Sequence, residues 1–461
     1  MILDADEELP KEQHAQLRQH LIEPGVIAWR LPLQDIGCES DGVSQVPRLF
    51  CNAPAIFYVS RIHEQVYASL ETRREQWGLE NKFGSAQLLH YGYQAAVVKS
   101  RDKINRNLRL LEVANEEYTN DVNLLMNLGL ELWRAGQQNF GIRYYDQAFK
   151  ILTLRPHQET PPELRQVLVT QYATHLLHLH RFTEVIAVLS HPSLQPSDLT
   201  ASHTFLRGVA HYELKQWAEC VTAMRSCLET RSKPTLTPVH PEVRLGGPAH
   251  CLANSLNKLG KIDEVQSAYE QAMKDSPKSE GIRLDYAFFL AQQRETIPAL
   301  TQLNELIGLN PQHAKAWEVG ACIALEKPET AEFALDWTQA AVGNLPDSKV
   351  IRRQYAEALL LNDRGSETIK IFSETANPHD PADLASFILC RILADEPLHP
   401  LAPSIELAVS QQFLKRYRQL VDFGAEKSVV KLNQNLALLD PILPSAAGLL
   451  KQALQSTELL A

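Results

Sequence analysis

The sequence lacks the features that mark membrane-spanning, secreted and disulfide-stabilised proteins. No apolar run reaches the roughly 18 residues of a membrane helix, and no basic-then-apolar leader opens the chain. We therefore expect neither a membrane span nor a secretory signal. The cysteines form no CxxC pair and are scattered, which predicts reduced thiols in a cytoplasmic protein. They are Cys38, Cys51, Cys220, Cys227, Cys251, Cys322 and Cys390.

The chain also lacks an excess of positive charge. Its net charge is −10 with a pI near 5.9, so a general nucleic-acid-binding surface is not expected. Hydrophobic residues make up 44% of the 461 residues, which is enough for packed cores and argues against wholesale disorder. The length predicts two to four domains.

From about residue 99 onward the pattern is purely helical and repeats. Pro277 and Pro311 are 34 residues apart, and Pro346 follows 35 residues later. Small residues recur beside large ones at fixed offsets before each of these prolines, as in Leu252, Ala253, Leu256, Gly260, Val265, Tyr269 and Ala272. This spacing resembles that of tetratricopeptide repeats.

The physical reason for the spacing is close helix packing. Small residues let two antiparallel helices approach, and no single pair can bury its apolar face alone, so the pairs stack into a solenoid. We predict about seven repeats over residues 121–381, preceded by a helical linker over 93–120. Residues 382–461 are expected to form a C-terminal helical, partly capping region.

Residues 1–92 mix strand and helix signals. Alternating or β-branched runs predict strands at 1–3, 25–33, 46–50 and 55–62, the second of them broken by Pro32, and residues 10–22 read as a helix. Strands between helices suggest an α/β unit. The predicted fold is therefore α+β at the N-terminus, followed by an all-α solenoid, and mainly α overall.

Two carboxylates stand out at the start of the chain. Asp4 and Asp6 alternate as i and i+2, so an extended segment would direct both to one face. At a strand end both could reach one hard divalent cation, which prefers oxygen ligands. The alternative is a solvated turn.

The run Asp4–Leu9 resembles the metal-binding motif of family 2 glycosyltransferases, which have the GT-A fold. Further segments resemble a bacterial subgroup of that family that carries tetratricopeptide repeats. These segments are Arg48-Leu49-Phe50, Arg61-Ile62-His63-Glu64, His90-Tyr91-Gly92-Tyr93 and residues 99–111.

The resemblance implies a transferase that uses a nucleotide-sugar donor and inverts the sugar. In that family the aspartates hold Mn²⁺ or Mg²⁺, which bridges the donor diphosphate and stabilises the leaving group. Asp6 would be the nearest ligand, and Asp4 would contact the ribose or a metal-bound water. His90 would be a further metal ligand; the alternative is a histidine hydrogen-bonded at a domain junction.

Three more residues take candidate roles. Glu64 is the candidate general base for an acceptor hydroxyl, and it could equally orient His63 or pair with Arg61. Arg48 could contact the donor phosphate or form a salt bridge on its strand. The acceptor could be a protein, a peptide or a glycan.

Other polar and aromatic groups fit structural roles. The basic stretch 99–109 reads as a solvated helical face, or as a grip on the diphosphate. His175, His178 and His180 do not share one helical face and are predicted to lie at a helix surface and turn. The tryptophans at repeat positions are predicted to be core: Trp133, Trp217, Trp317 and Trp337.

The chain departs from the family in one respect. A family 2 domain normally begins about 90 residues before the position of Asp4, so the resemblance implies that the part holding the nucleotide pocket is missing. That expectation leaves activity open. The alternative function is a non-enzymatic interaction scaffold that binds a protein partner through its solenoid.

Overall fold

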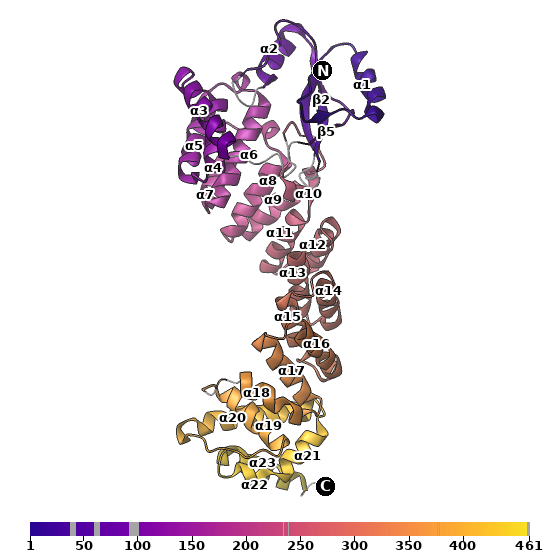
Figure 1. The fold of residues 1–461 in the computed structure, drawn as a ribbon, viewed down its shortest axis with the longest axis vertical. Helices are drawn as coiled ribbons and strands as arrows, with labels where there is room; N and C mark the ends of the chain where they lie inside the picture. Colours follow the sequence, from indigo (N-terminus) through magenta and orange to yellow (C-terminus); the bar gives the residue numbers. More distant parts are fainter. Residues whose placement is uncertain are drawn as a thin grey trace. The chain divides into compact units, whose positions relative to one another are not determined.

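The computed structural model describes the chain except residues 37–42, 60–64, 92–100, 234, 238, 376, 378 and 459–461, and the side chains of 101–103, 241 and 455–458. It divides into two compact units, Met1–Pro277 and Lys278–Ala461 (Figure 1). The first unit holds a small sheet and a stack of helices, and the second is helical. The fold is mainly α with an α+β N-terminal part, as predicted.

The sheet is centred on β2 (Val26–Asp35). One edge of β2 pairs antiparallel with β3 (Val43–Phe50), and the other pairs parallel with β4 (Glu80–Phe83) and then β5 (Leu88–His90). The short β1 (Glu7–Glu8) pairs antiparallel with β5. Pro32 does not break β2, because it lies between the residues that pair with β4 and those that pair with β5.

Helices α1 (His14–Leu21) and α2 (Tyr67–Trp77) each pack against one of two small hydrophobic cores on the sheet. One core contains Trp29, Leu31 and Leu88, with Leu17 of α1 packed against it. The other joins Ile27 and Ala28 to Leu70 of α2. Apolar side chains on both faces of β2 thus hold the helices to the sheet.

Two of the strand predictions are wrong. Residues 1–4 are not a strand: Ile2 N donates to Arg48 O at 2.9 Å, and a turn follows in which Glu7 N donates to Asp4 O at 3.1 Å. Aspartates favour such turns over strand continuation. Residues 55–58 are also not strand, because Ser69 Oγ bonds both backbone groups of Phe57 and takes the place of a neighbouring strand.

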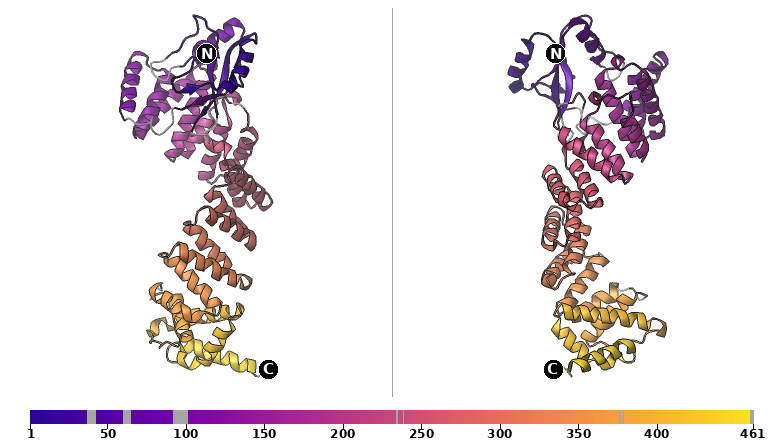
Figure 2. Two further views of the ribbon diagram at one scale, coloured as in Figure 1. Left: turned by 45° about the vertical axis from the view of Figure 1, so that its right-hand side comes forward. Right: turned by 180° about the vertical axis from the view of Figure 1, so that it is seen from behind.

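The helices of the first unit pack as consecutive antiparallel pairs, preceded by α3 (Arg101–Glu117). Figure 2 shows the pairs stacked side by side. Their bounds are α4 (Val122–Arg134), α5 (Gln138–Leu154), α6 (Pro162–His178), α7 (Phe182–Leu189), α8 (Ala201–Glu213), α9 (Trp217–Thr230), α10 (Pro241–Arg244), α11 (Gly247–Lys258) and α12 (Ile262–Asp275).

The second unit continues the pairing and ends in further helices. The pairs are α13 (Glu280–Gln292) with α14 (Thr296–Leu309), α15 (Ala314–Ala324) with α16 (Ala331–Asn344), and α17 (Lys349–Leu361) with α18 (Ile369–Thr375). They are followed by α19 (Pro381–Leu393), α20 (Pro403–Asp422), α21 (Glu426–Gln434), α22 (Leu436–Leu439) and α23 (Pro444–Glu458). None of the helices in the described ranges combines the length and the apolar character that a bilayer crossing requires.

The predicted close approach of paired helices is present. A Cβ on Gly141 of α5 would lie 2.7 Å from the carbonyl oxygen of Gly129 in α4, so neither position has room for a side chain. In the second unit a Cβ on Gly320 would lie 2.5 Å from Cε2 of Trp337. That indole cannot retreat easily, because it is buried and its Nε1 donates to Trp317 O at 2.9 Å.

We predict that Gly320→Ala destabilises the second unit by about 1–3 kcal/mol, because the added methyl overpacks the contact with Trp337. Gly308→Ala is the matched control, since a Cβ there meets nothing within 4 Å. It should be neutral or stabilising by up to about 1 kcal/mol through its higher helix propensity. Urea unfolding monitored by far-UV circular dichroism measures both; equal effects of the two substitutions would contradict the packing argument.

Candidate functional site

Arg48 gathers the acidic residues at the start of the chain. Its guanidinium contacts the carboxylate of Asp4, and Nη2 lies 2.5 Å from Glu7 Oε1. The Glu7 side chain is only 1% exposed, so this carboxylate depends on the arginine for its charge partner. Burial lowers the pKa of Arg48, but the hydrogen bond and charge of Glu7 outweigh it and the net pKa is raised. Arg48 thus forms a salt bridge, which was one of its two predicted roles. The other role, a contact with the donor phosphate, stays a prediction.

His90 lies between two other carboxylates. Nδ1 is 2.6 Å from Asp35 Oδ1, and Nε2 is 3.4 Å from Asp6 Oδ2. Partial burial lowers the pKa of His90, but Asp35 and then Asp6 outweigh this effect and raise it. A histidine with a raised folded pKa contributes stability below its unfolded value near 6.5 that is lost as the pH rises through the folded value.

Because of these contacts, the expected metal ligands have different partners. Asp4 faces Arg48, whereas Asp6 faces His90, so the three side chains do not form one donor set. Across the described residues there is no group of three or more His, Cys, Asp or Glu side chains that could hold a metal ion. We therefore derive no chemical step through Mn²⁺ or Mg²⁺, and the metal assignment stays a prediction. His63 and Glu64 lie outside the described residues, and their catalytic roles also stay predictions.

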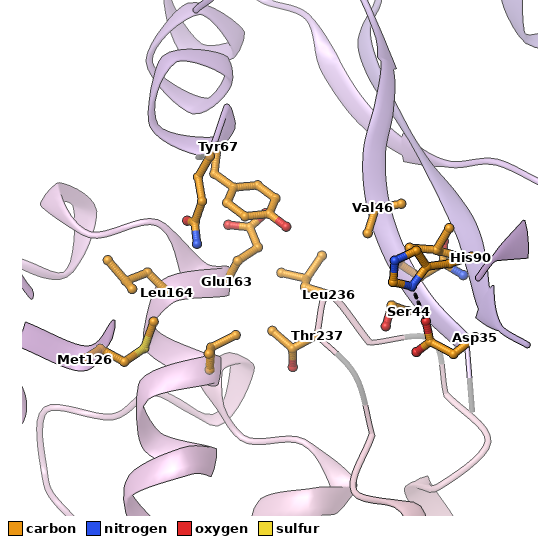
Figure 3. A pocket seen from close by; sticks show the side chains of 14 residues that line it. Asp35, Ser44, Val46, Tyr67, His90, Met126, Glu163, Leu164, Leu236 and Thr237 are labelled. Atoms are coloured by element: carbon orange, nitrogen blue, oxygen red, sulfur yellow. Dashed lines mark hydrogen bonds and ion pairs between the residues drawn. The ribbon is translucent and has the colours of Figure 1, made fainter. Parts of the chain in front are cut away.

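His90 and Asp35 line a cavity of about 240 Å³ between the sheet and the helices (Figure 3). The strands contribute one wall, α4 and α6 contribute a second, and the chain after α9 contributes a third. The labelled lining side chains are Asp35, Ser44, Val46, Tyr67, His90, Met126, Glu163, Leu164, Leu236 and Thr237. Its polar groups come from distant parts of the chain, so only the tertiary fold assembles them.

A second cavity of about 550 Å³ lies between the start of α2, the end of α3 and the N-terminal ends of α4 and α6. It shares Gln65, Tyr67 and Leu164 with the first cavity, so the two adjoin. Its lining is mainly apolar, and a mainly apolar cavity of this size is typical of binding sites.

A buried ion pair joins the sheet to the helices beside these cavities. Arg30 of β2 contacts Glu163 of α6, and the two side chains are 7% and 5% exposed. Arg30 also lies over the ring of Tyr67, with Cζ 5.6 Å from the ring centroid. Burial lowers the pKa of Arg30, opposed by Tyr67 and Glu71. A charge held this far from water is stable only while its partner stays in place.

We predict that Glu163→Gln destabilises the first unit by about 3–5 kcal/mol, because it leaves the Arg30 guanidinium buried without a countercharge. The double variant Arg30→Met/Glu163→Leu should recover most of the loss, since no charge is then buried. Urea unfolding of the full chain, analysed for the transition of the first unit, gives both values. If the double variant is less stable than Glu163→Gln, the unpaired charge of Arg30 is not the cause of the destabilisation.

His175 on α6 is buried, so its predicted surface position is wrong. Its ring stacks on Trp133 with centroids 3.9 Å apart, and its neighbour Tyr145 lies 4.9 Å away. Among the described residues, neither ring nitrogen has a hydrogen-bond partner. Burial, with a smaller contribution from His178, lowers the pKa of His175 to about 4. Contacts with the neighbouring helices bury this histidine, and the residue spacing within one helix does not predict those contacts.

We predict that acid destabilises the first unit between pH 6.5 and about 4 through His175. The unfolded state binds a proton in this window and the folded state does not, so stability falls as the pH falls. The cost approaches about 3 kcal/mol at the lower end. His175→Phe should remove it without loss at pH 7, because the ring needs no hydrogen bond. Urea unfolding at pH 4.5 and pH 7 measures the effect; exposed His14→Gln is the control, and equal pH dependence of both variants would contradict the assignment.

Sequence patterns gave no sign of several site residues. Asp35, Arg30 and Glu163 stand in no motif, and their partners lie far away along the chain. The one local signal was the alternation of β2, which would orient Leu33 and Asp35 to the same face. A tertiary contact was needed to select His90 as the partner of Asp35.

Comparison with known proteins agrees with the repeat assignment. No protein-family model matches the chain. A TPR repeat-containing protein of Synechococcus elongatus is 29% identical over 153 residues, which cover 32% of this chain and 38% of that protein. The match therefore spans little more than a third of the curated relative's length.

Solved tetratricopeptide structures resemble parts of the chain. YrrB, described as a TPR protein with an unusual peptide-binding site, covers 53% of this chain and 97% of its own, with 15% identity and a TM-score of 0.30. MamA of Desulfovibrio magneticus covers 42% and 96%, with 12% identity and a TM-score of 0.34. Such low scores carry no functional argument. The stacked helix pairs agree with the tetratricopeptide-like spacing of the sequence, and the glycosyltransferase resemblance has no counterpart among these proteins.

Proposed function

We propose that this protein is a non-enzymatic tetratricopeptide-type scaffold that binds a protein or peptide partner through its helix pairs. The observation that carries the proposal is a partly exposed apolar stripe on α13. Leu284, Phe288 and Ala291 recur at helical spacing on one side of the helix; Phe288 is 36% exposed, and Leu284 and Ala291 are half-buried. The opposite side of the same helix is buried, with Ile282, Tyr286 and Leu290 in the core.

The uncovered face extends to the next pair. Cys322 on α15 is exposed and lies 34 residues after Phe288, so the two residues occupy equivalent repeat positions. Glu357 occupies the next equivalent position, where it pairs with Arg416 of α20 at 2.7 Å. On this side of the helix pairs, the exposed apolar positions are therefore on α13 and α15, not on α17. A peptide with a large apolar side chain would bury Phe288 there.

The expected enzymatic groups give the transferase less support. The carboxylate of Asp4 is engaged by Arg48, and Asp6 and Asp35 lie on either side of His90. A nucleotide-sugar donor and a divalent cation remain what the resemblance implies. The scaffold is the function that the packed helix pairs support best.

We predict that peptides selected against the full chain from a random displayed library bind the α13–α15 face. Phe288→Ser should weaken their binding at least about tenfold in calorimetric titrations, because burial of an aromatic side chain often dominates a peptide interface. The matched control is Ile297→Ser on α14, since Ile297 is 66% exposed on the partner helix. It should leave the affinity unchanged.

Equal losses in the two variants, or no selected peptide, would contradict the scaffold assignment for this face. The transferase alternative is tested by titrating Mn²⁺ with a uridine diphosphate sugar into the wild type and into Asp4→Ala and Asp6→Ala. Heat that is present only in the wild type would restore the enzymatic alternative.

A further inference from the structure

Two cysteines of the first unit meet where the helix pair α8–α9 stacks on the pair α11–α12. Cys220 lies in the first turn of α9 and Cys251 lies in α11, and their Sγ atoms are 3.5 Å apart. Both thiols are free. Because the two residues are 31 positions apart, it is the packing of one helix pair on the next that brings the sulfurs together.

A serine hydroxyl completes this thiol cluster. Ser255, one turn after Cys251 on α11, has its Oγ 3.1 Å from Cys220 Sγ and 2.8 Å from Cys251 O. Its proton can be donated to the carbonyl or, when Cys220 is ionised, to the thiolate. Cys220 and Ser255 are fully buried, whereas Cys251 is half-buried. Cys251 therefore marks the side from which a small molecule approaches the cluster.

Cys220 differs from an ordinary buried thiol. Burial raises the pKa of a thiol, and Cys227, two turns later in α9, has its pKa raised to about 12 in this way. The pKa of Cys220 is lowered, because hydrogen bonds from Cys251 and Ser255 to the thiolate outweigh burial. The contact with Cys220, together with burial, raises the pKa of Cys251.

This difference gives the two sulfurs separate chemical roles. A thiolate is the nucleophile in thiol oxidation, and a neighbouring thiol can condense with the oxidised sulfur. Cys220 is prepared to lose its proton and Cys251 to keep it. The alternative is that both residues only fill space between the helices, as free cysteines often do. Cys227 fits that alternative role, whereas the contact between Cys220 and Cys251 exceeds what packing requires.

We propose that Cys220 and Cys251 form a site of reversible oxidation, where hydrogen peroxide converts the two thiols into a disulfide that locks the pair α8–α9 to the pair α11–α12. A disulfide requires the sulfurs to be about 2.05 Å apart, so they must approach each other by about 1.5 Å. The site lies in the first unit and is independent of the peptide face on α13 and α15.

The reaction has two steps. The thiolate of Cys220 attacks one oxygen of the peroxide, so that an S–O bond forms, the O–O bond breaks, and the departing hydroxide takes a proton to become water. The sulfur of Cys251 then attacks the sulfenic acid of Cys220, so that the S–S bond forms and the hydroxyl leaves with the Cys251 proton as a second water. Both sulfurs are oxidised, and the peroxide is reduced by two electrons. A dithiol reductant restores the thiols by exchange.

The junction between these helix pairs would gain stability from such a bond. Ion pairs already join α9 to α12: Arg225 contacts Glu264, and Arg231 Nη1 lies 2.7 Å from Asp275 Oδ2. Arg225 and Glu264 are exposed, and exposed ion pairs contribute little to stability. A disulfide that closes a loop of about 30 residues restricts the unfolded chain much more strongly.

The test treats the reduced full chain with hydrogen peroxide at low protein concentration. After the remaining thiols are alkylated, mass spectrometry of a non-reducing digest should find Cys220 linked to Cys251, and dithiothreitol should remove the link. Cys251→Ser should form no link at Cys220, and Cys227→Ala is the matched control that should link like the wild type. Thermal unfolding followed by circular dichroism should show the midpoint of the first unit raised by about 5–10 °C in the linked wild type only.

The role of the serine is tested by the rate of linkage. Ser255→Ala removes a hydrogen bond to the thiolate, so linkage at pH 7 should slow about tenfold and its pH profile should move to higher pH. A cysteine pair that serves packing alone would show no such change in the pH profile. The same rate and pH profile as the wild type would contradict the assigned role of Ser255.

Several results would overturn the proposal. One is a peroxide-treated wild type in which Cys220 and Cys251 are both still alkylated. Another is oxidation of Cys220 to a sulfinic acid without any link to Cys251. A linked protein whose unfolding midpoint equals that of the reduced protein would refute the locking role. Digests of the wild type decide the first two points even where a substituted chain does not fold.

Discussion

A buried charge is stable only beside an opposite charge. In the first unit this requirement holds the sheet against the helices. Arg30 of β2 and Glu163 of α6 are both nearly inaccessible to water. Separating the sheet from α6 would either bury one charge alone or admit water to both. Glu163 also lines the cavity that holds His90, and Arg30 lies over the ring of Tyr67, which lines the same cavity.

The two units differ in which positions of their helices are covered. In the first unit, Ser202 and Phe205 of α8 are buried, whereas in the second unit Phe288 of α13 and Cys322 of α15 are exposed. Single exposed apolar residues need no explanation, but a contiguous exposed apolar face often marks a surface that binds another protein. The α13–α15 face is the proposed surface of this kind.

The acidic residues at the N-terminus illustrate how contacts limit a motif. Asp4 and Asp6 satisfy a spacing that a metal site requires, but spacing does not say what else competes for the carboxylates. Here Arg48 and His90 do so, through contacts across the sheet and its neighbouring turn.

The sequence alone determined the repeat. The 34-residue spacing and the small residues at the helix contacts follow from local geometry, so pairs such as α4 with α5 could be predicted with their close approach at Gly129 and Gly141. The sequence also predicted the helix at residues 14–21 and a strand from residue 25, but the break that it predicted at Pro32 is absent from β2. Residues 1–3 and 55–58 were wrongly predicted as strands, because a strand exists only where another backbone offers a ladder, and here a turn and Ser69 took that place. Only the tertiary structure decided that Asp35 meets His90, that Arg30 meets Glu163, that His175 stacks on Trp133, and that Thr237 and His240 contact α6 and α8. Each of these joins parts of the chain that no local pattern relates, since the energy that selects them comes from burial and charge pairing after the helices have formed.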